Sequence, residues 1–199
     1  MATPTKSATV LLTPQQIASN GVLQSDDQDV STKYAGSFYL WLGRDDTGGA
    51  LTEGVDITVE GSGKASGDDA WIPLANFKSG VTTPETEAVT GTESAGATVI
   101  ELASTTNLVV NDLVLLKNTT IGNSEFGKIV AVVSNTSITL MDGITNAQTG
   151  STVYDQAERY VASGLDLMST LRVRVVYNAC NTGRTVVAYA LATWMDSQG

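Results

Sequence analysis

Residues 37–63 read SFYLWLGRDDTGGALTEGVDITVEGSG, and the patterns in this stretch decide the fold class. In its second part, apolar and polar residues alternate from Val55 to Glu60. Because successive side chains of a β-strand point to opposite faces, this alternation is typical of a half-buried antiparallel strand. The first part, 37–44, is apolar on both faces, and so it predicts a strand that is covered on both sides.

Further strand patterns lie on both sides of a central region. AWIPLANF (70–77) predicts an edge strand, because Pro73 has no N–H for a ladder hydrogen bond. Near the C-terminus, LRVRVVYNA (171–179) alternates, whereas RTVVAYAL (184–191) is apolar on both faces, as in a central strand. The sequence CNTG (180–183) predicts a hairpin turn between these two strands.

The central region differs from the strands around it. Residues 82–96 contain no aromatic residue and only one large aliphatic, which is typical of a linker. Four short apolar runs follow: ATVIEL, DLVLLKN, GKIVAVV and SITLM. We predict an all-β fold, an antiparallel β-sandwich of jelly-roll or immunoglobulin-like type formed by 34–81 and 154–199. A small β-barrel-like module with its flanking linkers, 82–153, is inserted in one of its loops. Such an insertion is tolerated because the cost of loop closure rises slowly with length.

Residues 1–33 mix Thr, Ser, Gln and Asp with isolated Leu and Val, and they show no sustained apolar stripe. Thr13 and Pro14 fit the cap and the first position of a short helical turn. We therefore predict that 1–33 form an N-terminal arm that runs along a neighbouring subunit or along its own domain. No apolar run has the length of a signal peptide or a membrane span, so synthesis in the cytoplasm without membrane contact is expected.

The composition argues against several classes of function. The 199-residue chain carries a net charge of −10, with only 11 Lys and Arg, and an acidic surface is repelled by a phosphate backbone. Direct binding of nucleic acid is therefore not expected. The chain has no histidine and a single cysteine, Cys180, which removes imidazole-based catalysis and thiolate zinc sites. We predict that the protein is not an enzyme and has no catalytic residue, no metal and no cofactor.

The acidic pairs and the glycine-rich segments are also expected to be turns and loops without a catalytic or ligand-binding role. Acidic pairs occur at Asp26-Asp27, Asp45-Asp46 and Asp68-Asp69. None has the alternating spacing of a calcium loop, so they are expected to be solvated turn residues. GSGKASG (61–67) lacks the glycine spacing of a phosphate-binding loop and predicts a hairpin loop.

The aromatic residues are the remaining candidates for a binding surface. Exposed Trp and Tyr rings stack on sugars and are favoured at protein interfaces, whereas buried rings fill the space between two sheets. The candidate contacts with a protein partner or a glycan are Trp41, Trp71, Trp194 and Tyr39. Core packing remains the alternative for each tryptophan.

The stretch 37–63 together with WIPLANFKSG (71–80) resembles the β-sandwich part of tailed-bacteriophage virion proteins. The central region is similar to a unit that recurs in small head-decoration (capsid cement) proteins and minor tail proteins. Its matching parts are ATVIELAST, VNDLVLL, GKIVAVVSNTSITL and NAQTGSTVY. The resemblance covers about 34–195, and these families have no invariant catalytic residues to carry over.

The resemblance implies a mechanical role. A capsid cement protein binds the outer capsid surface of the virion and stabilises the shell by bridging neighbouring subunits. The partners expected on this basis are the major capsid protein and neighbouring copies of the chain itself, as a homo-oligomer on the particle. The arm and one face of the sandwich are expected to dock on the shell. The alternatives are a tail, neck or baseplate component and a glycan-binding accessory domain.

Overall fold

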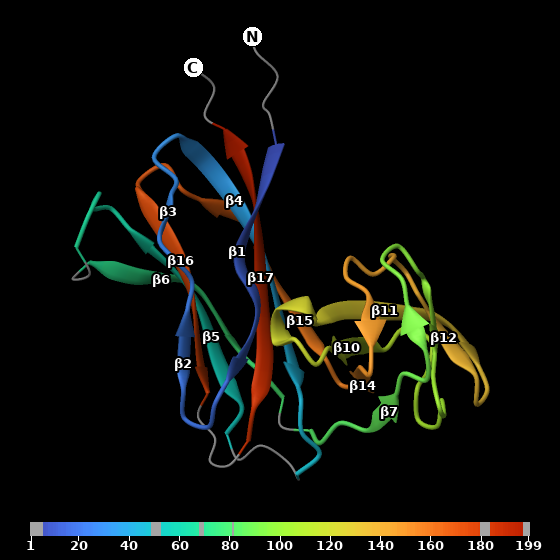
Figure 1. Cartoon of the computed structure of the whole chain (residues 1–199). Helices are drawn as coiled ribbons and strands as arrows, with labels where there is room; N and C mark the ends of the chain where they lie inside the picture. The colour runs from blue at the N-terminus through green and yellow to red at the C-terminus, as the bar shows by residue number, and fades with distance from the viewer. Residues whose placement is uncertain (1–5, 49–52, 68–69, 81, 180–183, 197–199) are drawn as a thin grey trace.

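The computed structural model describes residues 6–48, 53–67, 70–80, 82–179 and 184–196, which form antiparallel β-sheets with no α-helix among them (Figure 1). Two sheets pack face to face, and a third group, made of shorter strands, lies beside them. The prediction of an all-β antiparallel sandwich is confirmed.

The two sheets of the sandwich combine strands from both ends of the chain. The first sheet has the order β1 (Lys6–Ile17), β17 (Val186–Asp196), β4 (Lys33–Arg44) and β15 (Glu158–Asp166). The second has the order β2 (Val22–Gln24), β16 (Arg172–Ala179), β5 (Val55–Ser62) and β6 (Trp71–Lys78), with β3 (Gln28–Asp29) also paired to β16. As predicted, β4 and β17 are central strands. The edge position of β6 agrees with the proline in its sequence.

Alternate residues of the long strands meet between these sheets in one apolar core. Fully buried members include Phe38, Leu40, Val55, Ile57, Val59, Val173, Val175, Ala188 and Ala190. Tyr177 of β16 crosses this core, and its hydroxyl donates a hydrogen bond of 2.9 Å to the carbonyl of Tyr189 on β17. Burial raises the pKa of Tyr177, so its hydroxyl remains a donor that links the two sheets.

The N-terminal segment differs from the predicted arm. β1 pairs along its length with β17, and β2 and β3 pair with β16, so residues 6–33 belong to the sandwich (Figure 1). Leu12, Ile17 and Val30 of this segment are buried in its core. The sequence hid this strand because two register shifts against β17 interrupt its period-two alternation.

The predicted helical turn at Thr13 and Pro14 is also wrong. Both residues lie inside β1, between the pairs Leu12–Ala190 and Gln15–Ala188, where two residues of β1 lie opposite one residue of β17. A proline is tolerated here because β1 is an edge strand and the register shift leaves its nitrogen outside the ladder.

The connection after β16 is not the predicted hairpin. β16 belongs to the second sheet and β17 to the first, so the chain crosses from one sheet to the other between them. The segment 180–183, with Cys180, and the pair Asp68-Asp69 lie outside the described residues. In contrast, β5 and β6 are antiparallel neighbours, and GSGKASG leads from one to the other as a hairpin loop.

The third group of strands, called the module below, is formed by residues 86–154. Its larger sheet has the order β7 (Thr86–Ala88), β14 (Thr152–Tyr154), β10 (Leu113–Lys117), β11 (Glu125–Val133), β12 (Ser137–Leu140) and β9 (Val99–Glu101). β8 (Thr92–Glu93) pairs with β13 (Gln148–Thr149), and a 3-10 helix, η1 (Ile121–Asn123), precedes β11. The module has its own core, which includes Ile100, Val114, Leu116, Ile129 and Ile138. The predicted linker 82–96 therefore contains two strands of the module.

Candidate functional site

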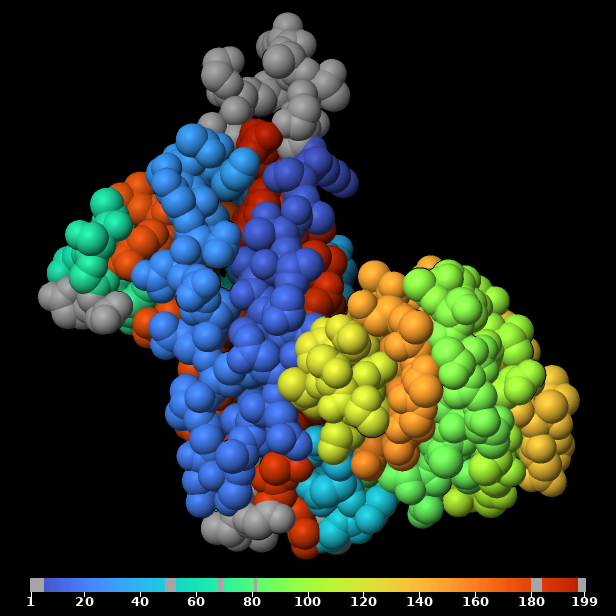
Figure 2. Space-filling view, viewed as in Figure 1, coloured from blue at the N-terminus to red at the C-terminus, as the bar shows by residue number. Residues whose placement is uncertain are grey.

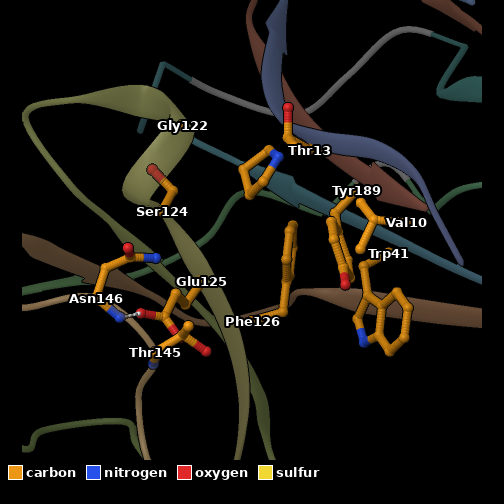
Figure 3. Close-up of a pocket in the computed structure, with 11 residues that line it drawn as sticks. Val10, Thr13, Trp41, Gly122, Ser124, Glu125, Phe126, Thr145, Asn146 and Tyr189 are labelled. Carbon is orange, nitrogen blue, oxygen red and sulfur yellow. Dashed lines mark hydrogen bonds between the residues drawn. The ribbon is translucent and has the colours of Figure 1, made fainter. Parts of the chain in front are cut away.

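A cleft lies where the module meets the outer face of the first sheet (Figures 2 and 3). This cleft has a volume of about 330 Å³. The sandwich contributes Val10, Thr13, Pro14, Trp41 and Tyr189, and the module contributes Gly122, Ser124, Glu125, Phe126, Thr145 and Asn146. The cleft is therefore built from segments that are far apart in the sequence.

The module can approach the sheet because β4 carries a glycine where the two bodies touch. A Cβ atom on Gly43 would lie 2.8 Å from Cβ of Leu115 and 3.1 Å from Cε1 of Phe126. Leu115 packs there with Ala157 and Val187 in a small apolar cluster. This contact fixes one end of the cleft, because a larger side chain at position 43 would push the module away.

A buried polar network holds the same junction. The Asp45 side chain, which has no solvent exposure, forms an ion pair with Nζ of Lys117 on β10 at 2.9 Å. It also accepts hydrogen bonds from Gln16 and from the hydroxyl of Thr185. The prediction of a solvated turn residue is wrong for Asp45, because the folded module covers it and supplies the positive charge.

The neighbouring carboxylate, that of Asp46, accepts hydrogen bonds from residues of the sandwich. Asp46 accepts hydrogen bonds from Arg44 at 2.7 Å and from the backbone N–H groups of Gly48 at 2.9 Å and Thr185 at 3.0 Å. Burial raises the pKa of Asp46, but the hydrogen bonds from these three donors outweigh it, so the pKa lies below its usual value. The carboxylate therefore stays charged at neutral pH and acts as a structural anchor.

Aromatic rings form the sandwich side of the cleft. Trp41 and Tyr189 are directly paired on β4 and β17, with ring centroids 5.1 Å apart and planes tilted by 45°. Tyr39 stacks on the other side of this group, 6.3 Å from Trp41. Figure 3 shows Phe126 of the module beside Tyr189, so that aromatic rings from both bodies line one wall.

The module side of the cleft presents polar atoms. Glu125 accepts hydrogen bonds from the backbone N–H groups of Thr145 at 2.7 Å and Asn146 at 2.6 Å, and from Nε2 of Gln148 at 3.3 Å (Figure 3). These bonds hold the 145–146 loop against β11. They also fix the orientation of the carboxylate at the rim of the cleft.

Two of the predicted contact residues lie elsewhere. Trp194 is a core residue with 4% exposure; its ring meets Phe38 edge-on at 5.4 Å, and its indole N–H donates to Thr9 at 3.0 Å. Trp71 is half-buried on the second sheet, with the guanidinium groups of Arg172 and Arg174 over its ring at 4.9 and 4.1 Å. The structure thus brings Trp41 and Tyr39 together and leaves the other two tryptophans apart.

Of the eleven residues that line the cleft, the sequence identified Trp41 as a candidate and missed the others, among them Tyr189, Phe126 and Glu125. Tyr189 lies in a strand that is apolar on both faces, and only its pairing with Trp41 reveals which face it shares. Phe126 and Glu125 reach the cleft because the module folds back onto the sandwich. No pattern within β11 itself carries that information.

Among the described residues, no three acidic or cysteine side chains gather closely enough to hold a metal ion. Within the same residues, no helix has the length and apolar character needed to cross a membrane.

No protein-family model and no curated protein matches the sequence. Among solved structures, a structure of the infectious bursal disease virus Gt strain is similar with a TM-score of 0.30 and 13% identity, over 97% of this chain and 42% of the other. The VP2 subviral particle of the same virus gives a TM-score of 0.30 and 13% identity, over 97% and 41%. VP17, a capsid protein of bacteriophage P23-77, gives 0.19 and 10%, over 98% of both chains. The chain spans less than half of the first two proteins, and TM-scores this low do not establish a shared fold.

Proposed function

We propose that the protein is a non-enzymatic virion structural protein that binds the outer surface of a capsid and bridges neighbouring subunits of the shell. The observation that carries this proposal is an exposed apolar surface on the module, called the valine face below. It consists of Val99, Val130 and Val133 on β9 and β11, and Val109, Val110 and Met141 are also exposed in turns of the module. These are six of the eleven large apolar side chains that are exposed among the described residues.

The strand pairing explains how this surface arises. Ile100, Ile138 and Val132 are paired across β9, β12 and β11, and their side chains point into the core of the module. Because side chains alternate, Val99 and Val133 lie on the opposite side of the same strands. Their exposed fractions are 47% and 53%, so these valines are open to solvent on a side of the sheet that also carries Thr139 and Glu101.

An open apolar surface of this kind marks a site of protein contact. Scattered exposed apolar residues are ordinary, whereas a group of them on one sheet is typical of an interaction surface. The acidic charge of the chain supports solubility before assembly. The sequence resemblance to capsid cement proteins supports the major capsid protein as the partner.

This geometry changes the expected mode of docking. Residues 6–33 are strands of the sandwich, so they are not available as an arm along a neighbour. Docking through the valine face leaves the sandwich intact, and the buried junction at Asp45 and Lys117 connects the two bodies. Several weak contacts of this type on adjacent shell subunits would give a high total affinity through multivalency.

The copy number of the chain in purified particles tests the proposal. We expect a ratio close to one copy, or a small whole-number fraction, per major capsid protein, measured by quantitative mass spectrometry with isotope-labelled peptides. A few copies per particle would assign the protein to the tail, neck or baseplate. Complete absence from the particles would overturn the virion role altogether.

A further inference from the structure

We propose that the cleft between the module and the first sheet binds an uncharged sugar ring of a glycan. This proposal rests on the geometry of the cleft and is independent of the virion role. A sugar ring is the class of ligand that fits, because the cleft has an aromatic wall on one side and a small set of polar groups on the other. Its volume of about 330 Å³ lies at the small end of the range of ligand pockets, which suits one or two sugar rings.

The aromatic wall supplies the apolar contact that a sugar ring requires. One face of a pyranose ring presents C–H groups, which pack on the electron-rich face of an aromatic ring. Trp41 is only partly buried, although Tyr39 and Tyr189 pack beside it, and Phe126 extends the wall from the module side. The neighbouring rings restrict the rotation of Trp41, so little side-chain entropy remains to be lost on binding.

The polar groups of the cleft suit a ligand that carries hydroxyl groups, and they do not suit a negatively charged ligand. Glu125 is the only charged residue that lines this cleft among the described residues. Its Oε1 accepts two hydrogen bonds, whereas its Oε2 accepts one, from Thr145 at 2.7 Å. Since each carboxylate oxygen can accept two hydrogen bonds, Oε2 retains capacity for a ligand hydroxyl. The negative charge of Glu125 disfavours acidic sugars and phosphates.

A proline-rich peptide is the other ligand class that uses aromatic grooves. Proline has no backbone N–H. A proline-rich segment would therefore cover the carboxylate of Glu125 without donating a hydrogen bond to its Oε2. A sugar hydroxyl supplies that donor, and the side chain of Asn146 offers further hydrogen-bonding groups at the cleft (Figure 3). The polar rim thus favours the sugar.

Nuclear magnetic resonance of the indole N–H groups of the full chain tests this proposal. The three tryptophans give three resonances, which single Trp→Phe variants assign. We expect neutral mono- and disaccharides of glucose, galactose and N-acetylglucosamine to shift the Trp41 resonance, with a dissociation constant of about 1 mM for the best of them. The Trp71 and Trp194 resonances should stay in place, and sialic acid and glucuronic acid should cause no shift.

Two variants and a matched control sharpen the test. Trp41→Ala should weaken binding of the best sugar about tenfold, and Asn146→Ala about threefold, measured by calorimetry. Trp71→Ala, on the opposite sheet, should leave the affinity unchanged. Unchanged Trp194 resonances in each variant show that the sandwich core is intact.

Three results would overturn the proposal. The first is that no neutral sugar shifts Trp41 at concentrations about ten times the expected dissociation constant. The second is equal shifts of all three indole resonances. The third is a Trp41 shift with a polyproline peptide and none with sugars, which would assign the cleft to a peptide instead.

Discussion

The sandwich and the module differ in how they gather the strands that form their cores. In the sandwich, β1 pairs with β17, so the first and last described strands of the chain are neighbours. In the module, all strands come from the continuous stretch 86–154. The sandwich core therefore forms only when both ends of the chain are present, whereas the module core depends on contacts that are closer in sequence.

The two bodies also differ in what covers their apolar surfaces. Part of the outer face of the first sheet is covered by the module, through Gly43, Val187 and Leu115. The outer face of β9, β12 and β11 has no such cover among the described residues, and its valines are exposed. The module therefore covers part of the sandwich and also carries exposed apolar side chains of its own.

Removal of residues 1–30 should have the largest effect on this comparison. It deletes β1, β2 and β3 and takes Leu12, Ile17 and Val30 from the core, so we expect loss of cooperative folding of the sandwich. Circular dichroism and thermal unfolding measure this outcome. The matched control is removal of residues 1–5, which leaves β1 complete and should preserve the transition.

Cooperative unfolding of the 31–199 fragment at an unchanged temperature would contradict the role of β1 in the core. It would instead restore the interpretation of the N-terminal segment as a dispensable arm. Partial retention of β-structure is expected in any case, because the core of the module does not include residues of the deleted segment.

A smaller effect is expected at the junction between the bodies. Lys117→Met leaves the buried carboxylate of Asp45 without its cation, and we expect a loss of about 2 kcal/mol in the free energy of unfolding. Lys78→Met is the control, because its ion pair with Asp56 is 3.6 Å long and solvent-exposed, and such pairs contribute about 0–1 kcal/mol. Denaturant titrations of the two variants measure both values. Equal losses would show that the junction is not held by the Asp45–Lys117 pair.

The sequence allowed the fold class to be predicted where alternation was regular. The pattern from Val55 to Glu60 identified β5, and Pro73 placed β6 at an edge. β1 was missed because register shifts place Leu11 and Leu12, two adjacent residues, on the buried side of the strand. Alternation cannot detect a strand whose buried residues lose their period.

The cleft was only partly predictable, for a different reason. Trp41 and Tyr39 were candidates because large aromatic residues at the surface favour binding. Trp194 is also a tryptophan, but it lies on the same side of β17 as Ala190 and Ala192. That side faces the core of the sandwich. Glu125 and Phe126 depend on how the module leans on the sandwich, which is decided by contacts such as that at Gly43.

Binding of valine-face variants to particles tests whether the module docks on the shell. Particles that lack the protein are incubated with the wild-type chain or with the double variant Val99→Lys/Val133→Lys, and co-sedimentation is quantified. We expect the double variant to lose binding, whereas Val22→Lys, at a more exposed position on β2 of the sandwich (64% against 47% and 53%), retains it. Full binding by a folded double variant, or loss of binding by Val22→Lys alone, would show that the valine face is not the docking surface.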